Sequence, residues 1–457
     1  MKFIFPLFIF IKSFCFAFQF NHDNKNNSYP FEDSPIGFAS IDILGNHGTT
    51  GGAGGDTVQF TDQTSFQTFF DGRRDDKNTK NFPPKVIIIK DTLTGTAQLV
   101  AKGVYDLTII GIGFNALFDG LGLAITNSRN IIVRNLEIRN CKPDCITINT
   151  TSSGFTHHIW VDHCTFSDSQ EIDPDGKNHD GLLDISHRSS FITVSWNHFY
   201  NHRKTCLLGF TDGNSEEMGQ LKTTYHHNWF EGTYSRHPRV KHTECHVYNN
   251  FYDDSKGNPY GIDYGIASTD GAKVLVEECY FDKVKNPTKT QEDSSPPRDL
   301  LERNNFFVDC DARSSTNIAF DPSQYYSYSL DSTADIPTIV KDGAGSGKLF
   351  LTTGVNDFKS YNKLPLEFEL KQNYPNPFNP STIIEYKLNN NENIEIVIYN
   401  INGQLVKNLF NKYASKGDYK VFWNGKDNGG NTAPSGVYFI KMGSNNFSVT
   451  KKIVLLK

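Results

Sequence analysis

Acidic and basic side chains that could act together on a charged substrate lie in one stretch of the chain, residues 179–241. Asp180 and Asp184 flank Gly181, where the backbone can bend, and two carboxylates at this spacing suit a hard cation held between oxygens. The basic residues that follow are Lys204, Arg236, Arg239 and Lys241. Carboxylates and cations gathered at one place can bind a metal ion and an anionic substrate side by side, because the metal bridges like charges.

Other polar pairs are weaker candidates for chemistry. Asp162–His163 could form a catalytic pair, but it lies inside an expected strand, and we interpret it as a buried structural pair. The pairs His157–His158 and His226–His227 could suggest zinc. Because neighbouring residues in a strand point to opposite faces, we expect neither pair to chelate a metal ion. The glycine-rich segment 37–55 lacks the GK[ST] ending of a phosphate-binding loop.

The composition favours a large, β-rich protein. The chain has 457 residues, 37% hydrophobic and 21% charged, which suits a folded protein of more than one domain. Its 36 Gly and only 3 Met favour β structure and tight turns over helix bundles. The formal net charge of -6 argues against a nucleic-acid partner, so a polyanion would have to be captured by a local basic patch.

The first residues have the character of an export signal. Lys2 precedes the apolar run FIFPLFIFI and Ala17 offers a cleavage position, so we expect residues 1–17 to be a signal peptide. No later stretch supplies the roughly 20 apolar residues of a membrane helix. The mature protein is therefore predicted to be soluble, without a membrane span.

Seven cysteines remain after that cleavage: Cys141, Cys145, Cys164, Cys206, Cys245, Cys279 and Cys310. Cys141 and Cys145 could close a small loop through a disulfide, which export permits. Because the number is odd, at least one thiol has no partner within the chain. The alternative, several buried thiols that act as small apolar groups, stays open.

A degenerate repeat runs through the middle of the chain. Its members are NLEI (135–138), HCTF (163–166), WNHF (196–199), HNWF (227–230), NNFY (249–252), ECYF (278–281) and NNFF (304–307). A spacing of 22 to 33 residues is typical of a solenoid. Buried strands are expected before the repeat at 86–89 and 107–110, and each repeat unit has room only for short β runs, so we predict stacked parallel coils with Asn and aromatic ladders. A β-sandwich is the structural alternative.

The composition changes after the repeat. The segment to residue 349 is interpreted as a closing cap, and residues 350–371 as a linker. From residue 372, NYPNPFNPSTIIEYKL begins with three Pro and then alternates apolar and polar residues. Further strands are expected at 393–401, 419–423, 437–442 and 447–455, with turns at Asn402–Gly403 and Asn428–Gly430. Residues 372–457 are therefore predicted to form an immunoglobulin-like β-sandwich.

An ordered set of motifs gives the chain a resemblance to a known family. The motifs are WVDH (160–163), HDGLLD (179–184), VSWNHF (194–199), NHRKT (201–205), RHPRVK (236–241) and HVYNN (246–250). In this order they resemble the pectate lyase superfamily over residues 37–349. The resemblance implies a right-handed parallel β-helix in residues 18–349 that degrades pectate.

The resemblance also implies roles for individual residues. Asp180 and Asp184 match two calcium-binding carboxylates, and Asp144 in CKPDCITI matches a third from the preceding coil. Lys204 matches the substrate-binding lysine of the family. Arg236 matches the arginine that is taken as the catalytic base.

Lys241 departs from the family pattern, which commonly has a second substrate-binding arginine at this position. Lysine keeps the charge but loses the fork that grips a carboxylate with two hydrogen bonds, so we expect retained activity with altered substrate affinity. Arg239 is expected to form a structural salt bridge, although it could also line the substrate cleft.

The chemistry can be argued from the substrate. In a polyuronate the proton on C5 is only weakly acidic while the neighbouring carboxylate keeps its charge. Ca²⁺ takes about 6 to 8 oxygens, so three aspartates leave room for the substrate carboxylate, and charge neutralisation stabilises the enolate-like intermediate. Lys204 can donate to that carboxylate while Arg236 takes the proton and the C4 oxygen leaves. An arginine base, with an ordinary pKa above about 12, predicts an alkaline optimum.

The C-terminal segment resembles the sorting domain of type nine secretion. The resemblance rests on YPNPFNPST, GVYFIKM and a basic end with Lys451 and Lys452. It implies the export machinery as a partner and a location outside a bacterium, secreted or at the cell surface. A carbohydrate-binding or adhesive sandwich is the alternative.

These observations together predict a secreted, monomeric, calcium-dependent pectate lyase that cleaves de-esterified polygalacturonate; endo and exo action stay open. A calcium-independent pectin lyase on methylated pectin is one alternative, but it should lack the acidic trio. A non-catalytic β-helix for polysaccharide binding or adhesion is the other, but it has no reason to keep Lys204 and Arg236.

Overall fold

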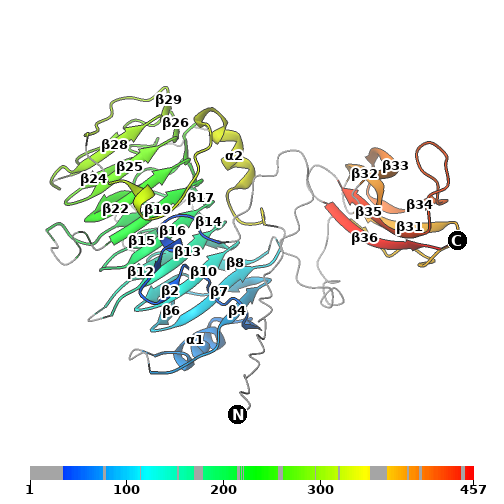
Figure 1. Cartoon of the computed structure of the whole chain (residues 1–457), viewed down its shortest axis with the longest axis horizontal. Coiled ribbons are helices and arrows are strands. Elements are labelled where there is room, and N and C mark those ends of the chain that lie inside the picture. Colours follow the sequence, from blue (N-terminus) through cyan, green and yellow to red (C-terminus); the bar gives the residue numbers. More distant parts are fainter. Residues whose placement is uncertain are drawn as a thin grey trace, which may run out of the picture. The chain divides into compact units, whose positions relative to one another are not determined.

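The computed structural model describes two compact units. The described residues are 34–75, 79–113, 115–151, 154–168, 179–213, 217, 219, 221–255, 261–293, 295–317, 320–349, 368–388, 391–400, 404–443 and 448–456. Those up to 349 form the first unit and those from 368 form the second (Figure 1). The expected signal peptide and most of the expected linker lie outside the described residues. The last part of that linker is a strand of the second unit, β30 (Phe368–Leu370).

The first unit is a right-handed parallel β-helix, as predicted. In the described part of the chain it has three parallel sheets of ten, nine and eight strands. The first sheet contains β3 (Asp56–Gln59), β4 (Lys85–Ile89), β7 (Tyr105–Gly111), β10 (Arg129–Arg134), β13 (His157–Asp162), β16 (Ser190–Ser195), β19 (Leu221–His226), β22 (Thr243–Tyr248), β25 (Lys273–Glu277) and β28 (Asp299–Arg303). The second contains β5 (Thr92–Thr94), β8 (Leu117–Asp119), β11 (Glu137–Arg139), β14 (Thr165–Ser167), β17 (His198–Tyr200), β20 (Trp229–Glu231), β23 (Phe251–Asp253), β26 (Tyr280–Asp282) and β29 (Phe306–Val308). The third contains β6 (Leu99–Lys102), β9 (Leu123–Thr126), β12 (Ile146–Asn149), β15 (Leu183–Ile185), β18 (Leu207–Leu208), β21 (Arg239–Lys241), β24 (Ile266–Thr269) and β27 (Thr288–Lys289).

Each turn of the helix visits the three sheets in order, for example β13, β14 and β15. The next turn stacks on it in parallel, so that Ile159 pairs with Ile192 and Phe166 with Phe199. The strands predicted at 86–89 and 107–110 are contained in β4 and β7. Because side chains alternate along a strand, one row of each sheet faces the core and the next row faces outward.

The repeat in the sequence marks the bend between the first and second sheets. The first residue of every member has a left-handed backbone; the φ values lie between 48° and 56° at Asn135, His163, Trp196, His227, Asn249, Glu278 and Asn304. The second position forms an asparagine ladder, in which Asn197 Nδ2 donates to Asn228 Oδ1 (3.0 Å) and Asn228 Nδ2 to Asn250 Oδ1 (2.9 Å). The amide groups therefore replace backbone hydrogen bonds that the bend interrupts.

The fourth position of the repeat forms an aromatic stack inside the β-helix. The stacked rings are those of Phe166, Phe199, Phe230, Tyr252, Phe281 and Phe307. Their centroids are 4.4 to 5.2 Å apart, and interplanar angles of 12° or less show that the rings are nearly parallel. The predicted Asn and aromatic ladders are thus confirmed, and they fix the register of successive coils.

Two helices cover the β-helix at different places. Helix α1 (Gln63–Gly72) begins at Asp62, whose side chain accepts from the Ser65 N–H, and it inserts Phe66 and Phe70 into the first hydrophobic core. Helix α2 (Ile336–Gly343) packs on the outer face of β23 at Phe251. The remaining short elements are β1 (Asp42–Ile43), β2 (Asn46–His47) and the 3₁₀ turns Phe38–Ser40, Pro322–Gln324 and Thr333–Asp335.

The second unit is a small antiparallel sandwich. One sheet contains β30, β31 (Thr382–Leu388) and β34 (Gly417–Trp423); the other contains β32 (Glu392–Asn400), β33 (Leu405–Ala414), β35 (Gly436–Gly443) and β36 (Ser448–Leu455). Trp423 is fully buried in the core between them. The strands expected after residue 390 correspond to β32, β34, β35 and β36, whereas β33 was not predicted.

The cysteines combine both expected arrangements. Cys141 and Cys145 form a disulfide. The free thiols of the described residues are Cys164, Cys206, Cys245 and Cys279, which are buried, and Cys310, which is half-buried. None of the helices in the described residues is both long and apolar enough to cross a bilayer.

Candidate active site

The outward face of the third sheet gathers most of the charged residues singled out in the sequence. Leu183, Ile185, Leu208 and Val240 are buried, so the alternate positions of β15, β18 and β21 point outward. The strand register places Asp184 beside Thr147 of the preceding coil. In the next two coils, Leu207 and then Arg239 occupy the same position of the register. Asp184 and Arg239 therefore share one outward row, and Lys241 lies two residues further along β21.

Asp144, Asp180 and Asp184 converge at the amino ends of β12 and β15. Asp144 lies in the loop closed by the Cys141–Cys145 disulfide, and its Oδ1 accepts from the Gly181 N–H (2.7 Å). Asp184 Oδ1 accepts from the Leu207 N–H of the next coil (2.9 Å). A Cβ on Gly181 would lie only 2.5 Å from Asp184 Oδ1, so a larger residue here would displace the Asp184 carboxylate.

The carboxylates in this group oppose one another electrostatically. Burial raises the pKa of Asp144, and the Asp180 carboxylate adds to the effect. Burial likewise raises the pKa of Asp184, with the Asp144 carboxylate as the next cause, whereas Arg236 acts in the opposite direction. An added cation would relieve this repulsion.

Two basic residues complete this group. Lys204 Nζ lies 2.8 Å from Asp180 Oδ1. Arg236 has a left-handed backbone (φ 66°), and its carbonyl accepts from the Cys206 N–H (2.8 Å), which anchors the strained residue to the preceding coil. Among the described residues, the partly exposed Arg236 guanidinium has no hydrogen-bond or ion-pair partner. We refer to Asp144, Asp180, Asp184, Lys204 and Arg236 as the aspartate cluster.

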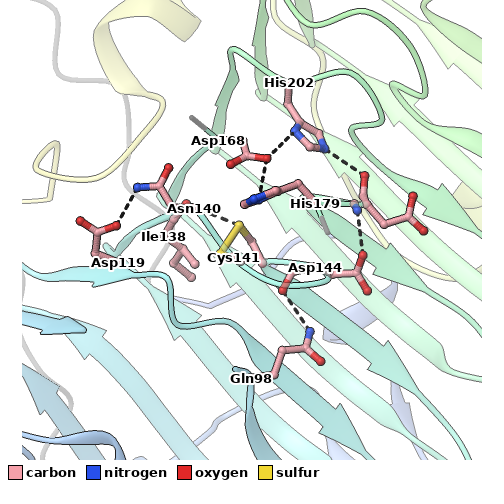
Figure 2. The surroundings of a disulfide bond; sticks show 12 residues. Gln98, Asp119, Ile138, Asn140, Cys141, Asp144, Asp168, His179 and His202 are labelled. Carbon is pink, nitrogen blue, oxygen red and sulfur yellow. Dashed lines mark hydrogen bonds and ion pairs between the residues drawn. A yellow bond between two sulfur atoms is a disulfide. The ribbon is translucent and has the colours of Figure 1, made fainter. Parts of the chain in front are cut away.

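Histidines behind the aspartate cluster hold its backbone. His202 Nε2 donates to the carbonyl of Asp180 (2.9 Å), and its Nδ1 lies 3.5 Å from Asp168 Oδ2. The same Asp168 oxygen lies 3.0 Å from His179 Nδ1. Figure 2 shows Asp144, Asp168, His179 and His202 around the disulfide. The position of Asp180 is thus fixed from its main chain, which leaves its carboxylate facing Lys204.

Arg239 and Lys241 form a separate group in which every charge has a partner. Lys241 Nζ lies 2.6 Å from Asp212 Oδ1, and Arg239 lies 2.6 Å from Asp293 Oδ2. The buried Ser295 hydroxyl joins the two pairs, because it accepts from Arg239 (2.8 Å) and donates to Asp212 Oδ2 (2.7 Å). We refer to Asp212, Arg239, Lys241, Asp293 and Ser295 as the paired cluster.

The donor chemistry of the aspartate cluster suits Ca²⁺, which prefers carboxylate oxygens and fills its remaining positions with water or ligand. In the part of the chain that the structure describes, however, no three His, Cys, Asp or Glu side chains are gathered closely enough to hold a metal ion. Each of the three carboxylates has a donor of the protein on its Oδ1 atom: Gly181 N–H on Asp144, Leu207 N–H on Asp184 and Lys204 on Asp180.

Comparison with known proteins places the β-helix in a family. A model of the pectate lyase family matches residues 84–349. A pectate trisaccharide-lyase from Bacillus licheniformis is 34% identical over 333 residues, which cover 71% of this chain and 90% of that protein. Another from Thermotoga sp. (strain RQ2) is 34% identical over 358 residues, with 69% and 90% covered. The chain belongs to the pectate lyase family.

The solved structures agree with this membership. The crystal structure of a pectate lyase from Bacillus sp. N165 in complex with trigalacturonate has a TM-score of 0.58 at 30% identity and covers 68% of this chain and 99% of that one. The predicted polysaccharide lyase class is therefore confirmed. In the second unit of this pectate lyase, residues 381–447 match a FlgD Ig-like domain, which agrees with the predicted immunoglobulin-like fold.

One geometric expectation about this pectate lyase was wrong. The neighbouring histidines do not point to opposite faces: His157 and His158 approach at their Nδ1 atoms (2.7 Å), as do His226 and His227 (2.9 Å). The reason is that His158 and His227 have left-handed backbones, with φ values of 56° and 53°, which interrupt the alternation of a regular strand. By contrast, Asp162–His163 is fully buried, as expected, against Arg134.

Several residues around the pectate lyase site were not singled out from the sequence. His202 and Asp168 support Asp180, while Asp212, Asp293 and Ser295 neutralise or link Arg239 and Lys241. Only their positions in the sequence could have indicated them. His202 lies in the NHRKT motif, and Asp212 lies in a short glycine-flanked loop after β18. Which of the charged residues bind substrate, metal or proton stays a prediction.

Proposed function

We propose that this pectate lyase cleaves de-esterified polygalacturonate by calcium-dependent β-elimination and releases 4,5-unsaturated oligogalacturonides. The observation that carries the proposal is the Arg236 guanidinium, which makes no hydrogen bond or ion pair in the described part of the chain and whose charge acts on the buried Asp184 carboxylate. The relatives named as pectate trisaccharide-lyases and the trigalacturonate complex of the Bacillus enzyme support the substrate class.

Asp144, Asp180 and Asp184 are the residues that would hold calcium. Bound there, calcium would neutralise the substrate carboxylate and so make the neighbouring C5 proton more acidic. The raised pKa values of Asp144 and Asp184, caused first by burial and then by neighbouring carboxylates, support this assignment, because a bound cation would stabilise their ionised forms.

Lys204 and Arg236 are proposed to handle the substrate. The Lys204 ammonium, which faces Asp180, would exchange this partner for the substrate carboxylate and hold the reacting sugar. The Arg236 guanidine nitrogen would accept the C5 proton, and the electron pair of that C–H bond would form the C4–C5 double bond as the C4–O bond breaks. The departing oxygen would keep the electron pair of the C4–O bond and take a proton from solvent water. The anchored backbone of Arg236 keeps the base in place during this step.

The location outside the cell is part of the same proposal. An apolar N-terminal segment supports export, and the C-terminal sandwich is proposed to engage the secretion machinery. Deletion of residues 372–457 should leave the lyase activity of the cell contents intact and abolish its appearance in the medium or at the cell surface of a producing bacterium.

The decisive experiment follows the ultraviolet absorbance of unsaturated product from polygalacturonate in calcium and in excess chelator. We expect product only in calcium and none from Arg236→Ala. Chelator-resistant product from highly methylated pectin would favour the pectin lyase alternative. Equal activity of Arg236→Ala and the unaltered protein would exclude Arg236 as the base while leaving the reaction class in place.

A further inference from the structure

The paired cluster differs from a plain binding site for anionic sugars because its two cations are already neutralised. The side chains of Lys241 and Arg239 are only 11% and 9% exposed, whereas those of Asp212 and Asp293 are 38% and 70% exposed. The two cations therefore lie beneath the protein surface, and the two carboxylates lie at the surface. A sugar chain that reaches this position meets two carboxylates before it meets either cation.

Displacement of these carboxylates by a substrate carboxylate is unfavourable. Asp212 accepts from both Lys241 and Ser295, and these hydrogen bonds lower its pKa, so it stays ionised at neutral pH. A substrate carboxylate that paired with Lys241 would have to approach the charged Asp212. Two cations and two carboxylates also leave the paired cluster without net charge.

The loop that carries Asp212 presents an apolar surface at the same place. Phe210 is 50% exposed, and its ring lies 4.2 Å from the His187 ring, centroid to centroid. The loop is held in position: the Phe210 N–H donates to Glu217 Oε2 (3.0 Å), and Lys241 Nζ donates to the Phe210 carbonyl (3.4 Å). Glu217 itself is fully buried. An aromatic ring fixed in this way suits the face or the methyl group of a sugar derivative.

We propose that Phe210, Asp212 and Lys241 form a binding subsite for an uncharged, methyl-esterified galacturonyl unit. The aspartate cluster demands a free carboxylate at the reacting sugar, whereas this subsite tolerates or prefers an ester. The substrate in this view is partially methylated pectate, with one free carboxylate at the reacting position and an ester nearby. The inference rests on the proposed function, since it concerns the same bound sugar chain.

The test compares kcat/KM on polygalacturonate with kcat/KM on pectins of stepwise higher methyl-ester content. The variant is Asp212→Asn, which releases Lys241 from its charged partner and leaves the aspartate cluster unchanged. The matched control is Asp56→Asn on β3, which removes the carboxylate of another Lys–Asp pair, the 2.8 Å pair with Lys85 on β4. We expect Asp212→Asn to shift the preference toward polygalacturonate about two- to fivefold, the range of a charge pair whose carboxylate is partly screened by solvent, and the control to leave it unchanged.

A second measurement needs no variant. Mass spectrometry of the products that the unaltered protein forms from randomly methylated pectin should find methyl esters enriched at one fixed position relative to the new unsaturated end. A random distribution, or an Asp212→Asn preference equal to that of the control, would overturn the subsite while polygalacturonate cleavage in calcium still supported the proposed function. An unaltered protein that forms no product from polygalacturonate would overturn both.

Discussion

The aspartate cluster and the paired cluster contain the same kinds of residues on the same outward face, yet they differ in how their charges are balanced. In the aspartate cluster only Asp180 of the three carboxylates forms an ion pair, with Lys204, and the Arg236 guanidinium makes no hydrogen bond or ion pair with the described residues. In the paired cluster Arg239 and Lys241 each have a carboxylate within 2.6 Å. Unbalanced charge is costly in a folded protein unless a ligand completes it. The aspartate cluster therefore needs a ligand to balance its charges, whereas the charges of the paired cluster balance one another without a ligand.

The largest effect is expected from Arg236→Lys. The change keeps a positive charge, but it shortens the side chain and removes the guanidine nitrogens proposed to accept the C5 proton. We expect kcat to fall by about 10²- to 10⁴-fold, the contribution of a positioned base, with a smaller change in KM. Initial rates of unsaturated product measure this. Arg298→Lys, the same change at an exposed arginine, should retain full activity; if both variants behave alike, the aspartate cluster has no special base.

Asp184→Asn tests whether the aspartate cluster is incomplete without a cation. Since the folded state raises the pKa of Asp184, its ionised form costs stability at neutral pH, and a neutral amide should remove that cost. Calcium at a hundred times its dissociation constant should stabilise the unaltered protein by about 2.7 kcal/mol. Most of that gain should be absent in Asp184→Asn.

Thermal unfolding in calcium and in chelator measures both effects of Asp184→Asn without reference to activity. Asp56→Asn serves again as the control and should respond to calcium like the unaltered protein. The same calcium-induced stabilisation in Asp184→Asn and in the control would show that these carboxylates do not bind the ion.

A buried histidine between the two clusters, His237, should make the free energy of unfolding depend on pH. His237 lies between Arg236 and Arg239; it is fully buried, and its Nδ1–H donates to the Tyr264 carbonyl (2.7 Å). Burial lowers the pKa of His237 to about 3, so the folded state favours the neutral ring. Its contribution to stability is complete above the unfolded-state pKa of about 6.5 and is lost as the pH falls toward 3, by up to about 1.4 kcal/mol for each pH unit.

Denaturant unfolding at stepwise lower pH measures this loss in the unaltered protein. Replacement His237→Gln should reduce the dependence of the unfolding free energy on pH below 6.5. The control His47→Gln changes an exposed side chain and should leave that dependence as it was. A flat profile from pH 6.5 to 4 in the unaltered protein would contradict the buried neutral state of His237.

The difference between the clusters also shows what could be predicted from the sequence. The repeat predicted the bend, ladder and stack positions because the coils from residue 163 on repeat the same local requirement, a left-handed residue, an asparagine or a cysteine, and an aromatic ring. Asp180, Asp184 and Lys204 could be expected at one site because their motifs lie in one stretch and in the order that the resemblance requires, while their roles stay a prediction. The partners of Lys241 and Arg239 could not, because Asp212 and Asp293 come from loops of other coils and no local pattern links them. The close histidine pairs were missed because strand alternation was assumed where His158 and His227 are left-handed.

The smallest effect is expected from Lys241→Arg, which restores the residue common in the family. Arginine could grip a substrate carboxylate with two hydrogen bonds, but Asp212 lies 2.6 Å from the Lys241 ammonium and would be an equally good partner for the guanidinium. We therefore expect kcat to stay the same and KM for polygalacturonate to change by less than about fivefold, within the range of an ion pair whose carboxylate is partly screened by solvent. The double variant Lys241→Arg with Asp212→Asn provides the contrast. Without the competing carboxylate, the arginine should lower KM further than either single change does. If Lys241→Arg alone lowered KM as far as the double variant, Asp212 would not be neutralising this position, and the distinction between the two clusters would fail at this residue.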